Sequence, residues 1–169
     1  MGILHTIAAS YSLVALLLVV SQWDTGAGDT YKDARCGHGR PKLTKEEIEG
    51  EVSFRFFNHN KSCVHVMATA SETKGFKRLH DCVTNCETGQ GAEPRCAGPR
   101  VEHCNSHEEC LDEVYYFDAH MQKCVQFNAP FEVDIRTNNI FMFIDTCEDY
   151  CMGFTEDDLK KARQKKAEA

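Results

Sequence analysis

Cys147-Glu-Asp-Tyr-Cys151 closes a pattern of three cysteines and one phenylalanine that the chain contains twice. Further back along the chain, the pattern includes Phe141, six residues before Cys147, and Cys124. The earlier copy has the same residue types at matched places, which are Cys63, Phe76, Cys82 and Cys86. A repeat of this length, with its cysteines at matched places, predicts one small disulfide-stapled domain used twice.

The first copy predicts a β-hairpin followed by a helix. The aromatic segment 52–57 is β-prone, Asn58-His-Asn60 supplies turn residues, and 63–66 alternates like a returning strand. The stretch 76–86 is expected to form a short helix. The two cysteines of this helix are four residues apart and therefore share a face, so the helix can be pinned at two points.

The second copy predicts the same plan further along the chain. Strands are expected at 114–118 and 125–127, with a turn at 119–123 between them. The helix is expected at 143–151, and Gly153 lies just past its end, where glycine commonly terminates a helix.

The aromatic residues of the predicted hairpins are expected to form a core, and an exposed binding stripe is the alternative. Those in the first strand of each hairpin are Phe54, Phe56, Phe57, Tyr115, Tyr116 and Phe117. The two repeated phenylalanines, Phe76 and Phe141, are expected to pack beneath the disulfides.

The N-terminal segment 1–27 reads as a secretory signal peptide. Its apolar run, Ile7 to Val20, is short for a membrane span, and small residues around Ala27 offer a cleavage site. An uncleaved membrane anchor is the alternative. No later segment is apolar enough to span a membrane, so we expect a secreted, extracellular protein.

All ten cysteines follow this signal. An even number of cysteines in an exported chain predicts five disulfides, because the compartment is oxidising. Zinc binding is the alternative, since eight histidines accompany the cysteines, but Cys-x-x-x-Cys alone is not a zinc-finger spacing. We therefore expect no metal and no cofactor. The net charge of −7 argues against a general nucleic-acid-binding protein.

Composition predicts two domains, a linker and a tail. The domains are expected at 36–86 and 96–153, with the Gly- and Pro-containing stretch 87–95 as their linker. Each domain is too small to rely on its apolar core alone. In the tail, 154–169, acidic residues precede basic ones, which suits a helix dipole. We expect a solvated or frayed helix there; the alternative is an electrostatic arm for a sulfated glycan or membrane.

The two copies resemble the Kunitz-type (pancreatic trypsin inhibitor-like) domain. That family has an aromatic strand, then a cysteine, an Asn-Asn-Phe-like stretch and a helix carrying Cys-x-x-x-Cys. The second copy matches this order with Tyr115, Tyr116, Phe117, Asp118, Cys124, Phe127, Asn139, Phe141, Cys147 and Cys151. The first copy matches with Phe56, Phe57, Asn58, Cys63, Phe76, Cys82 and Cys86, with Val66 in place of the usual aromatic. The chain is similar in this to the two-domain Kunitz-like proteins of tick saliva.

The resemblance implies a small disulfide-rich α+β fold. Two Kunitz-like domains would stand in tandem, each a twisted β-hairpin plus a C-terminal helix. The implied disulfides are Cys63–Cys82, Cys36–Cys86 and Cys124–Cys147. Cys151 would pair with Cys96 or Cys104, and the choice of Cys96 would leave Cys104–Cys110.

A Kunitz inhibitor holds an extended loop rigid in the substrate cleft of a serine protease. In the first domain the resemblance places this loop near Thr44, Lys45 and Glu46, with Lys45 as the trypsin-like specificity residue. In the second domain it places Cys110 before the loop, with Leu111 as the specificity residue. The alternative is that these are ordinary structural residues, and the stretch 45–51 is expected to be a short helical turn or an exposed loop.

The chain departs from the family at the brace of this loop. The family joins the loop by a disulfide to a Gly-Gly-Cys turn, whereas this chain has Ala68-Thr-Ala-Ser71 and Phe131-Glu-Val-Asp134 at these places. The first domain also lacks the cysteine that precedes the loop. The departure leaves two functions open, because the framework is kept and the brace is missing.

The first function is a secreted serine endopeptidase inhibitor that binds a host protease reversibly, as a substrate would. The alternative is a non-inhibitory Kunitz scaffold that binds an ion channel or another host protein, such as a receptor. An enzyme is not expected, because the chain lacks nucleophile and nucleotide-binding motifs. We expect a monomer. Asn60-Lys-Ser62 is a sequon for N-glycosylation at the predicted hairpin turn.

Overall fold

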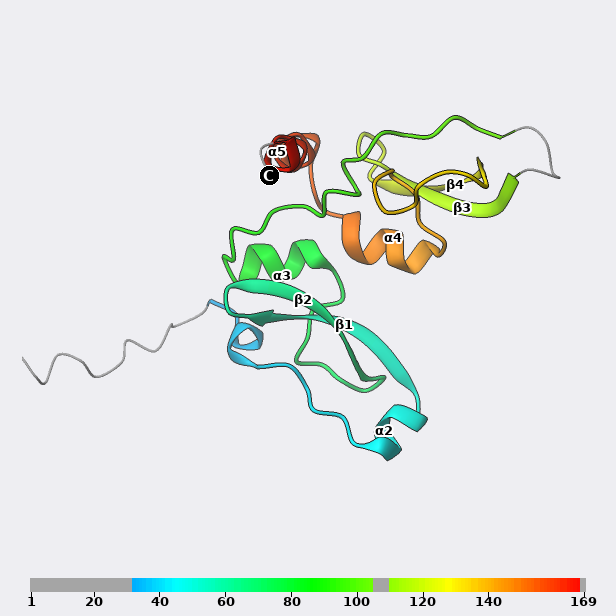
Figure 1. The fold of residues 1–169 in the computed structure, drawn as a ribbon. Coiled ribbons are helices and arrows are strands. Elements are labelled where there is room, and N and C mark those ends of the chain that lie inside the picture. Colours follow the sequence, from blue (N-terminus) through cyan, green and yellow to red (C-terminus); the bar gives the residue numbers. More distant parts are fainter. Residues whose placement is uncertain (1–31, 105–109, 168–169) are drawn as a thin grey trace, which may run out of the picture. The chain divides into compact units, whose positions relative to one another are not determined.

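Two antiparallel β-hairpins, each followed by a short helix, form the framework of the described chain (Figure 1). The computed structural model describes residues 32–104 and 110–167, so the expected signal peptide, 1–27, lies outside the described residues. The first hairpin and its helix are β1 (Val52–His59), β2 (Ser62–Thr69) and α3 (Leu79–Asn85). The second set is β3 (Cys110–Asp118), β4 (Lys123–Pro130) and α4 (Ile144–Cys151). The small disulfide-rich α+β class is confirmed.

The first hairpin turns two residues later than the sequence predicts. β1 continues through His59, which pairs with Ser62, so that only Asn60 and Lys61 lie between the strands. Both have positive φ, 50° and 59°, as the central residues of a type I′ turn require. Asparagine reaches this conformation more readily than most residues, which fixes the turn at Asn60.

The second hairpin has a longer loop, as expected. The carboxylate of Asp118 accepts hydrogen bonds from the backbone N–H groups of His120 (3.0 Å) and Met121 (2.9 Å) and so holds the loop. β3 begins at Cys110, earlier than the expected start at residue 114. A bulge between Leu111 and Val114 interrupts the pairing there.

The two copies share one pair of backbone hydrogen bonds at the repeated phenylalanine. Phe76 returns to pair with Phe56, with N–H···O distances of 2.8 and 2.9 Å. In the second copy Phe141 pairs with Tyr115 in the same way, at 2.8 Å in both directions. Each repeated phenylalanine therefore forms an isolated β-bridge with the first strand of its hairpin. Both phenylalanines are buried, as expected. For this reason α3 begins at Leu79 and not at residue 76.

Five disulfides join the ten cysteines, and none of these cysteines is free. They are Cys36–Cys86, Cys63–Cys82, Cys96–Cys151, Cys104–Cys110 and Cys124–Cys147. In each copy one bridge ties the helix to the hairpin and a second ties the helix to the start of the copy. The pairings are those that the family resemblance implies, with Cys96 as the partner of Cys151.

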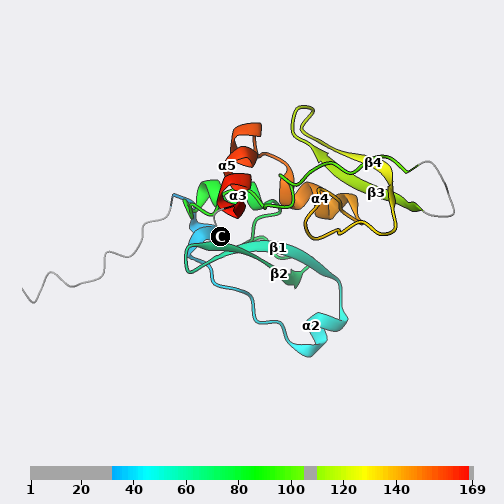
Figure 2. The same ribbon diagram turned by 45° about the horizontal axis from the view of Figure 1, so that its top comes forward.

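The two hairpin–helix units, called here the first module (36–86) and the second module (96–153), contribute to one buried cluster. In both views of the ribbon, α3 and α4 lie between the two hairpins (Figure 2). The ring of Tyr150 on α4 meets Phe56 edge-on, with centroids 5.2 Å apart. The stretch 87–95, expected to be a linker, packs here: Ala92 is buried and Gln90 accepts a hydrogen bond from the backbone of Cys63 at 2.6 Å.

Gly153 ends α4 in the manner predicted. Its φ is +97°, a conformation that side chains rarely adopt, and a Cβ there would lie 2.6 Å from the ring of His80. The chain then turns into α5 (Glu156–Ala167). Among residues 32–104 and 110–167, no helix has the length and apolar character needed to cross a membrane.

The C-terminal helix α5 packs against the protein, which differs from the solvated tail expected from its charges. Leu159 and Ala162 are three residues apart on one helical face, and both are buried in the shared cluster. The guanidinium of Arg163 donates a hydrogen bond to the carbonyl of Ala97. The buried pair Leu159 and Ala162, together with the hydrogen bond of Arg163, docks a helix that is otherwise charged.

Candidate functional site

The first predicted protease-binding segment is a capped helix. Thr44 precedes α2 (Lys45–Glu49), its hydroxyl accepts a hydrogen bond from the N–H of Glu47 (3.3 Å), and its own N–H donates to the Glu47 carboxylate (2.8 Å). This reciprocal pair is a capping box. Lys45 and Glu46 therefore lie in the first turn of a helix, exposed to solvent, rather than in extended backbone.

The second predicted segment is part of a strand. Cys110 is the first residue of β3, is buried and pairs with Pro130, and Leu111 pairs with Ala129 and is half-buried. Cys110 is bonded to Cys104, six positions away. This bridge closes a short local loop, whose residues 105–109 lie outside the described residues.

The sequon lies where the sequence places it. Asn60 is exposed at the turn between β1 and β2, and Ser62 is the first residue of β2. A glycan on Asn60 would extend into solvent. Glycan occupancy remains a prediction.

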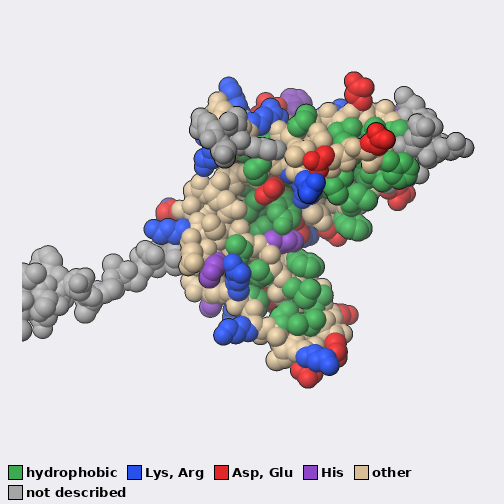
Figure 3. Space-filling model, in the orientation of Figure 1, with side chains coloured by type: hydrophobic (Ala, Val, Ile, Leu, Met, Phe, Trp, Pro, Cys, Tyr) green, Lys and Arg blue, Asp and Glu red, His purple; other side chains and the backbone are tan. Residues whose placement is uncertain are grey.

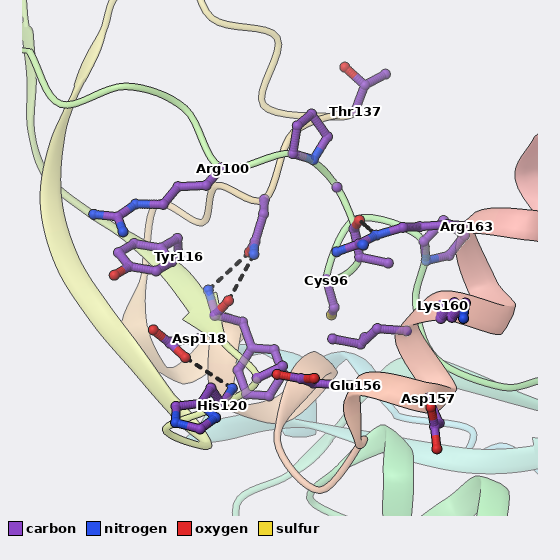
Figure 4. A pocket seen from close by; sticks show the side chains of 18 residues that line it. Cys96, Arg100, Tyr116, Asp118, His120, Thr137, Glu156, Asp157, Lys160 and Arg163 are labelled. Carbon is purple, nitrogen blue, oxygen red and sulfur yellow. Dashed lines mark hydrogen bonds between the residues drawn. The ribbon is translucent and has the colours of Figure 1, made fainter.

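A groove of about 1220 Å³ runs between α5 and the start of the second module (Figure 4). Its walls carry charges of both signs: Arg100, Lys160 and Arg163 against Asp118, Glu156 and Asp157. Several of these groups are already engaged, since Arg100 lies 4.3 Å from the centroid of the Tyr116 ring and Arg163 bonds Ala97. The groove is therefore a partly satisfied polar surface.

Asn139, at the floor of this groove, is a structural residue. Its side-chain amide donates to the carbonyl of Phe117 at 2.8 Å, and its oxygen accepts from the Phe117 N–H at 2.9 Å. Both groups are buried, so the pair of bonds satisfies backbone that would otherwise lose its partners.

A second cleft, of about 390 Å³, lies where the first hairpin meets α4, and we call it the hairpin–helix cleft. Phe54 and Arg55 of β1, His65 of β2 and Asp149 of α4 are among the residues that line it. Three polar atoms of these residues are buried without a hydrogen-bond partner: Arg55 Nε, His65 Nε2 and Asp149 Oδ1. Buried polar groups of native proteins are nearly always paired, so this concentration marks the cleft.

Burial shapes the charge of this cleft. It raises the pKa of the Asp149 carboxyl, which the nearby cations Lys77 and Arg55 oppose and the acids Asp145 and Glu148 reinforce. Burial also lowers the pKa of His65, whose ring is stacked on Phe56 with centroids 4.5 Å apart. A histidine with a lowered pKa is neutral at physiological pH.

Sequence reasoning missed a further pair of equivalent residues, the arginines before the first cysteine of each module. The guanidinium carbon of Arg35 lies 4.0 Å from the centroid of Phe76, and that of Arg95 lies 4.2 Å from the centroid of Phe141. Each arginine thus covers the repeated phenylalanine of its own module by a cation–π contact. The sequence does contain a clue to this pair, because the dipeptide Arg-Cys occurs at both places, 35–36 and 95–96.

No family model matches the chain, and no curated protein matches it.

Proposed function

We propose that this chain is a secreted, two-domain Kunitz-like protein that binds a host ion channel or receptor and does not inhibit a serine protease. The resemblance of the sequence to the Kunitz family supports the scaffold. The hairpin–helix modules and their five disulfides agree with that scaffold and suit an oxidising compartment.

The observation that carries the proposal is the regular structure at the inhibitory positions. A substrate-like inhibitor needs a specificity residue on extended, exposed and braced backbone, so that little entropy is lost on binding. Lys45 is instead the first residue of a capped helix, and Leu111 lies in a paired strand. Cys110 bonds Cys104, so no disulfide joins Leu111 to the opposite side of a loop.

Exposed apolar side chains support a binding role for the surface. Phe54 and Met67 are cross-strand partners on the first hairpin and are exposed by 49% and 36%. Phe143, just before α4, is exposed by 70%. Figure 3 shows hydrophobic side chains gathered over both hairpin regions. Exposed apolar groups of this size mark interaction surfaces in soluble proteins.

Inhibition assays test the proposal. The oxidised mature chain is titrated against trypsin-, chymotrypsin- and elastase-like proteases, with its fold confirmed by near-ultraviolet circular dichroism. We expect no inhibition at micromolar protein. Nanomolar inhibition of any of them, lost in Lys45→Ala or Leu111→Ala, would overturn the proposal and identify the active module.

A cell-binding assay tests the second part of the proposal, that the chain binds a host channel or receptor. Labelled chain is expected to bind saturably to intact host cells, and Phe143→Ser is expected to weaken that binding. Gln164→Ala, an exposed change on α5, serves as the control. Binding that does not saturate, or that is equally strong for the parent and for Phe143→Ser, would contradict recognition through this surface.

A further inference from the structure

The hairpin–helix cleft lacks partners for its polar groups. Five side-chain polar atoms in the described part of the chain are buried without a hydrogen-bond partner, and Arg55, His65 and Asp149 hold three of them. Only 9% of Asp149 is exposed to solvent. All three residues line the same cleft, which therefore brings together a carboxylate, a guanidinium and an imidazole, groups that can accept and donate hydrogen bonds.

The charges of the cleft select the kind of ligand. Two cations, Arg55 and Lys77, face two acids, Asp145 and Asp149, and His65 is neutral. The net charge of these four groups is zero. In the described part of the chain, none of the ion pairs joins one of these cations to one of these acids. A simple anion would meet the acids and a simple cation would meet the arginine. A ligand that carries one charge of each sign satisfies both sets.

The volume of the cleft and its apolar wall restrict the choice of ligand further. A cavity of about 390 Å³ is at the small end of ligand sites and suits a molecule of about a dozen heavy atoms. The ring of Phe54 lies on its wall, 5.2 Å from the ring of His65, and is half-exposed. Aromatic rings prefer to pack on aromatic rings at such distances.

We propose that the hairpin–helix cleft binds a free aromatic α-amino acid. Its carboxylate would accept hydrogen bonds from the guanidinium of Arg55 and from the ammonium of Lys77, its ammonium would donate to the carboxylate of Asp149, and its ring would lie against Phe54. A peptide terminus offers only one of the two charges, which favours the free amino acid. This inference does not rest on the proposed function: Phe54 belongs to both surfaces, but the binding of a free amino acid needs no host protein and is measured without one.

Calorimetric titration of the full oxidised chain with L-phenylalanine tests the charge complementarity. The comparison ligands are phenethylamine, which lacks the carboxylate, and 3-phenylpropionate, which lacks the ammonium. We expect phenylalanine to bind at least about tenfold more tightly than either, because each loses one charged contact. Absence of saturable phenylalanine binding, or equal affinity for all three, would overturn the proposal.

Matched variants locate the binding. Asp149→Asn and Arg55→Gln are each expected to weaken phenylalanine binding about tenfold or more, while Glu148→Gln changes it less than about twofold. Glu148 is next to Asp149 on α4 but does not line the cleft. Binding that both cleft variants leave intact would place the ligand elsewhere and contradict the assignment.

Nuclear magnetic resonance of the unmodified chain gives a second readout that does not depend on variants. The ring proton signals of His65 are expected to shift on addition of phenylalanine, while those of His59, exposed at the turn of the same hairpin, stay in place. If the variants fail to fold, this experiment decides alone, and an unmoved His65 signal would refute the proposal.

Discussion

At the residue scale, Asn139 shows how one side chain can hold two segments together. It bonds both backbone groups of Phe117 and connects β3 to the loop before α4. The first module also contains a buried amide, Asn58 at a different position on β1, which donates to the carbonyl of Cys36 at 2.9 Å. Buried amides therefore fix both modules, although at different joints.

We predict that Asn139→Ala lowers the free energy of unfolding by about 2–4 kcal/mol, because it leaves a buried N–H and a buried carbonyl of Phe117 unpaired. Chemical denaturation measures this loss. Asn138→Ala is the control, since Asn138 is only half-buried and its side chain makes a single hydrogen bond, to the carbonyl of Asp134. If both substitutions lowered the free energy of unfolding equally, the buried N–H and carbonyl of Phe117 would not be the cause of the loss.

A second residue-scale prediction concerns pH. Burial raises the pKa of Asp149 above its ordinary value of 3.8, so the folded state takes up this proton more readily than the unfolded state. The group therefore favours folding at low pH, and this contribution is lost as pH rises through its raised pKa. Asp149→Asn is expected to unfold at a higher temperature than the parent at pH 7, and the difference should shrink toward pH 3.8.

Thermal unfolding of both proteins between pH 3 and pH 7 measures this difference. Glu148→Gln on the same helix is the control and should show no comparable convergence. A parent that is more stable than Asp149→Asn at pH 7 would show that the carboxylate is paired in solution.

The residues that the sequence could predict are those with a repeated pattern. Phe76 and Phe141 recur at a fixed distance from cysteines, so their burial followed from one rule. Arg55, His65 and Asp149 have no such pattern, because their shared environment arises only where one module meets the other. Contacts between modules depend on tertiary packing that no local spacing encodes.

At the element scale, α2 and α5 show how short signals decide between helix and loop. Thr44-x-x-Glu47 is a capping-box sequence, which made the helical alternative for 45–51 the correct one. The same device starts α5, where the Thr155 hydroxyl donates to Asp158 at 2.7 Å and helps to lower the pKa of that carboxyl. The docking of α5 was not predicted, because Leu159 and Ala162 are only two apolar residues in a charged stretch.

We predict that Leu159→Ala destabilises the protein by about 2–4 kcal/mol, since it removes a buried side chain and leaves a cavity beneath α5. Urea denaturation followed by circular dichroism measures the change. Gln164→Ala on the exposed face of the same helix is expected to change stability by less than about 0.5 kcal/mol. If Leu159→Ala were equally harmless, α5 would be detached in solution.

At the scale of the whole molecule, the disulfides differ in how much chain they restrain. Cys96–Cys151 spans 55 residues and Cys104–Cys110 spans 6. Loop-closure entropy gives about 4 kcal/mol for the long bridge and about 2 kcal/mol for the short one. The bridge that closes the second module is therefore expected to stabilise the protein more than the short Cys104–Cys110 bridge does.

We accordingly expect Cys96→Ser with Cys151→Ser to lose about 2 kcal/mol more stability than Cys104→Ser with Cys110→Ser. Thermal and denaturant unfolding under non-reducing conditions compare the two double variants. A short bridge that proved the more important would indicate that its local geometry, and not chain restraint, stabilises the module.

We propose that the two modules have a Kunitz-like framework in which Cys110 does not brace an inhibitory loop. Mass-spectrometric mapping of the disulfides in the non-reduced protein tests this proposal most directly. The result we predict is five cross-linked peptide pairs, with Cys110 joined to Cys104 and Cys151 joined to Cys96. A cross-link from Cys110 to any other cysteine, such as Cys124, would contradict this pairing and would favour a braced inhibitory loop.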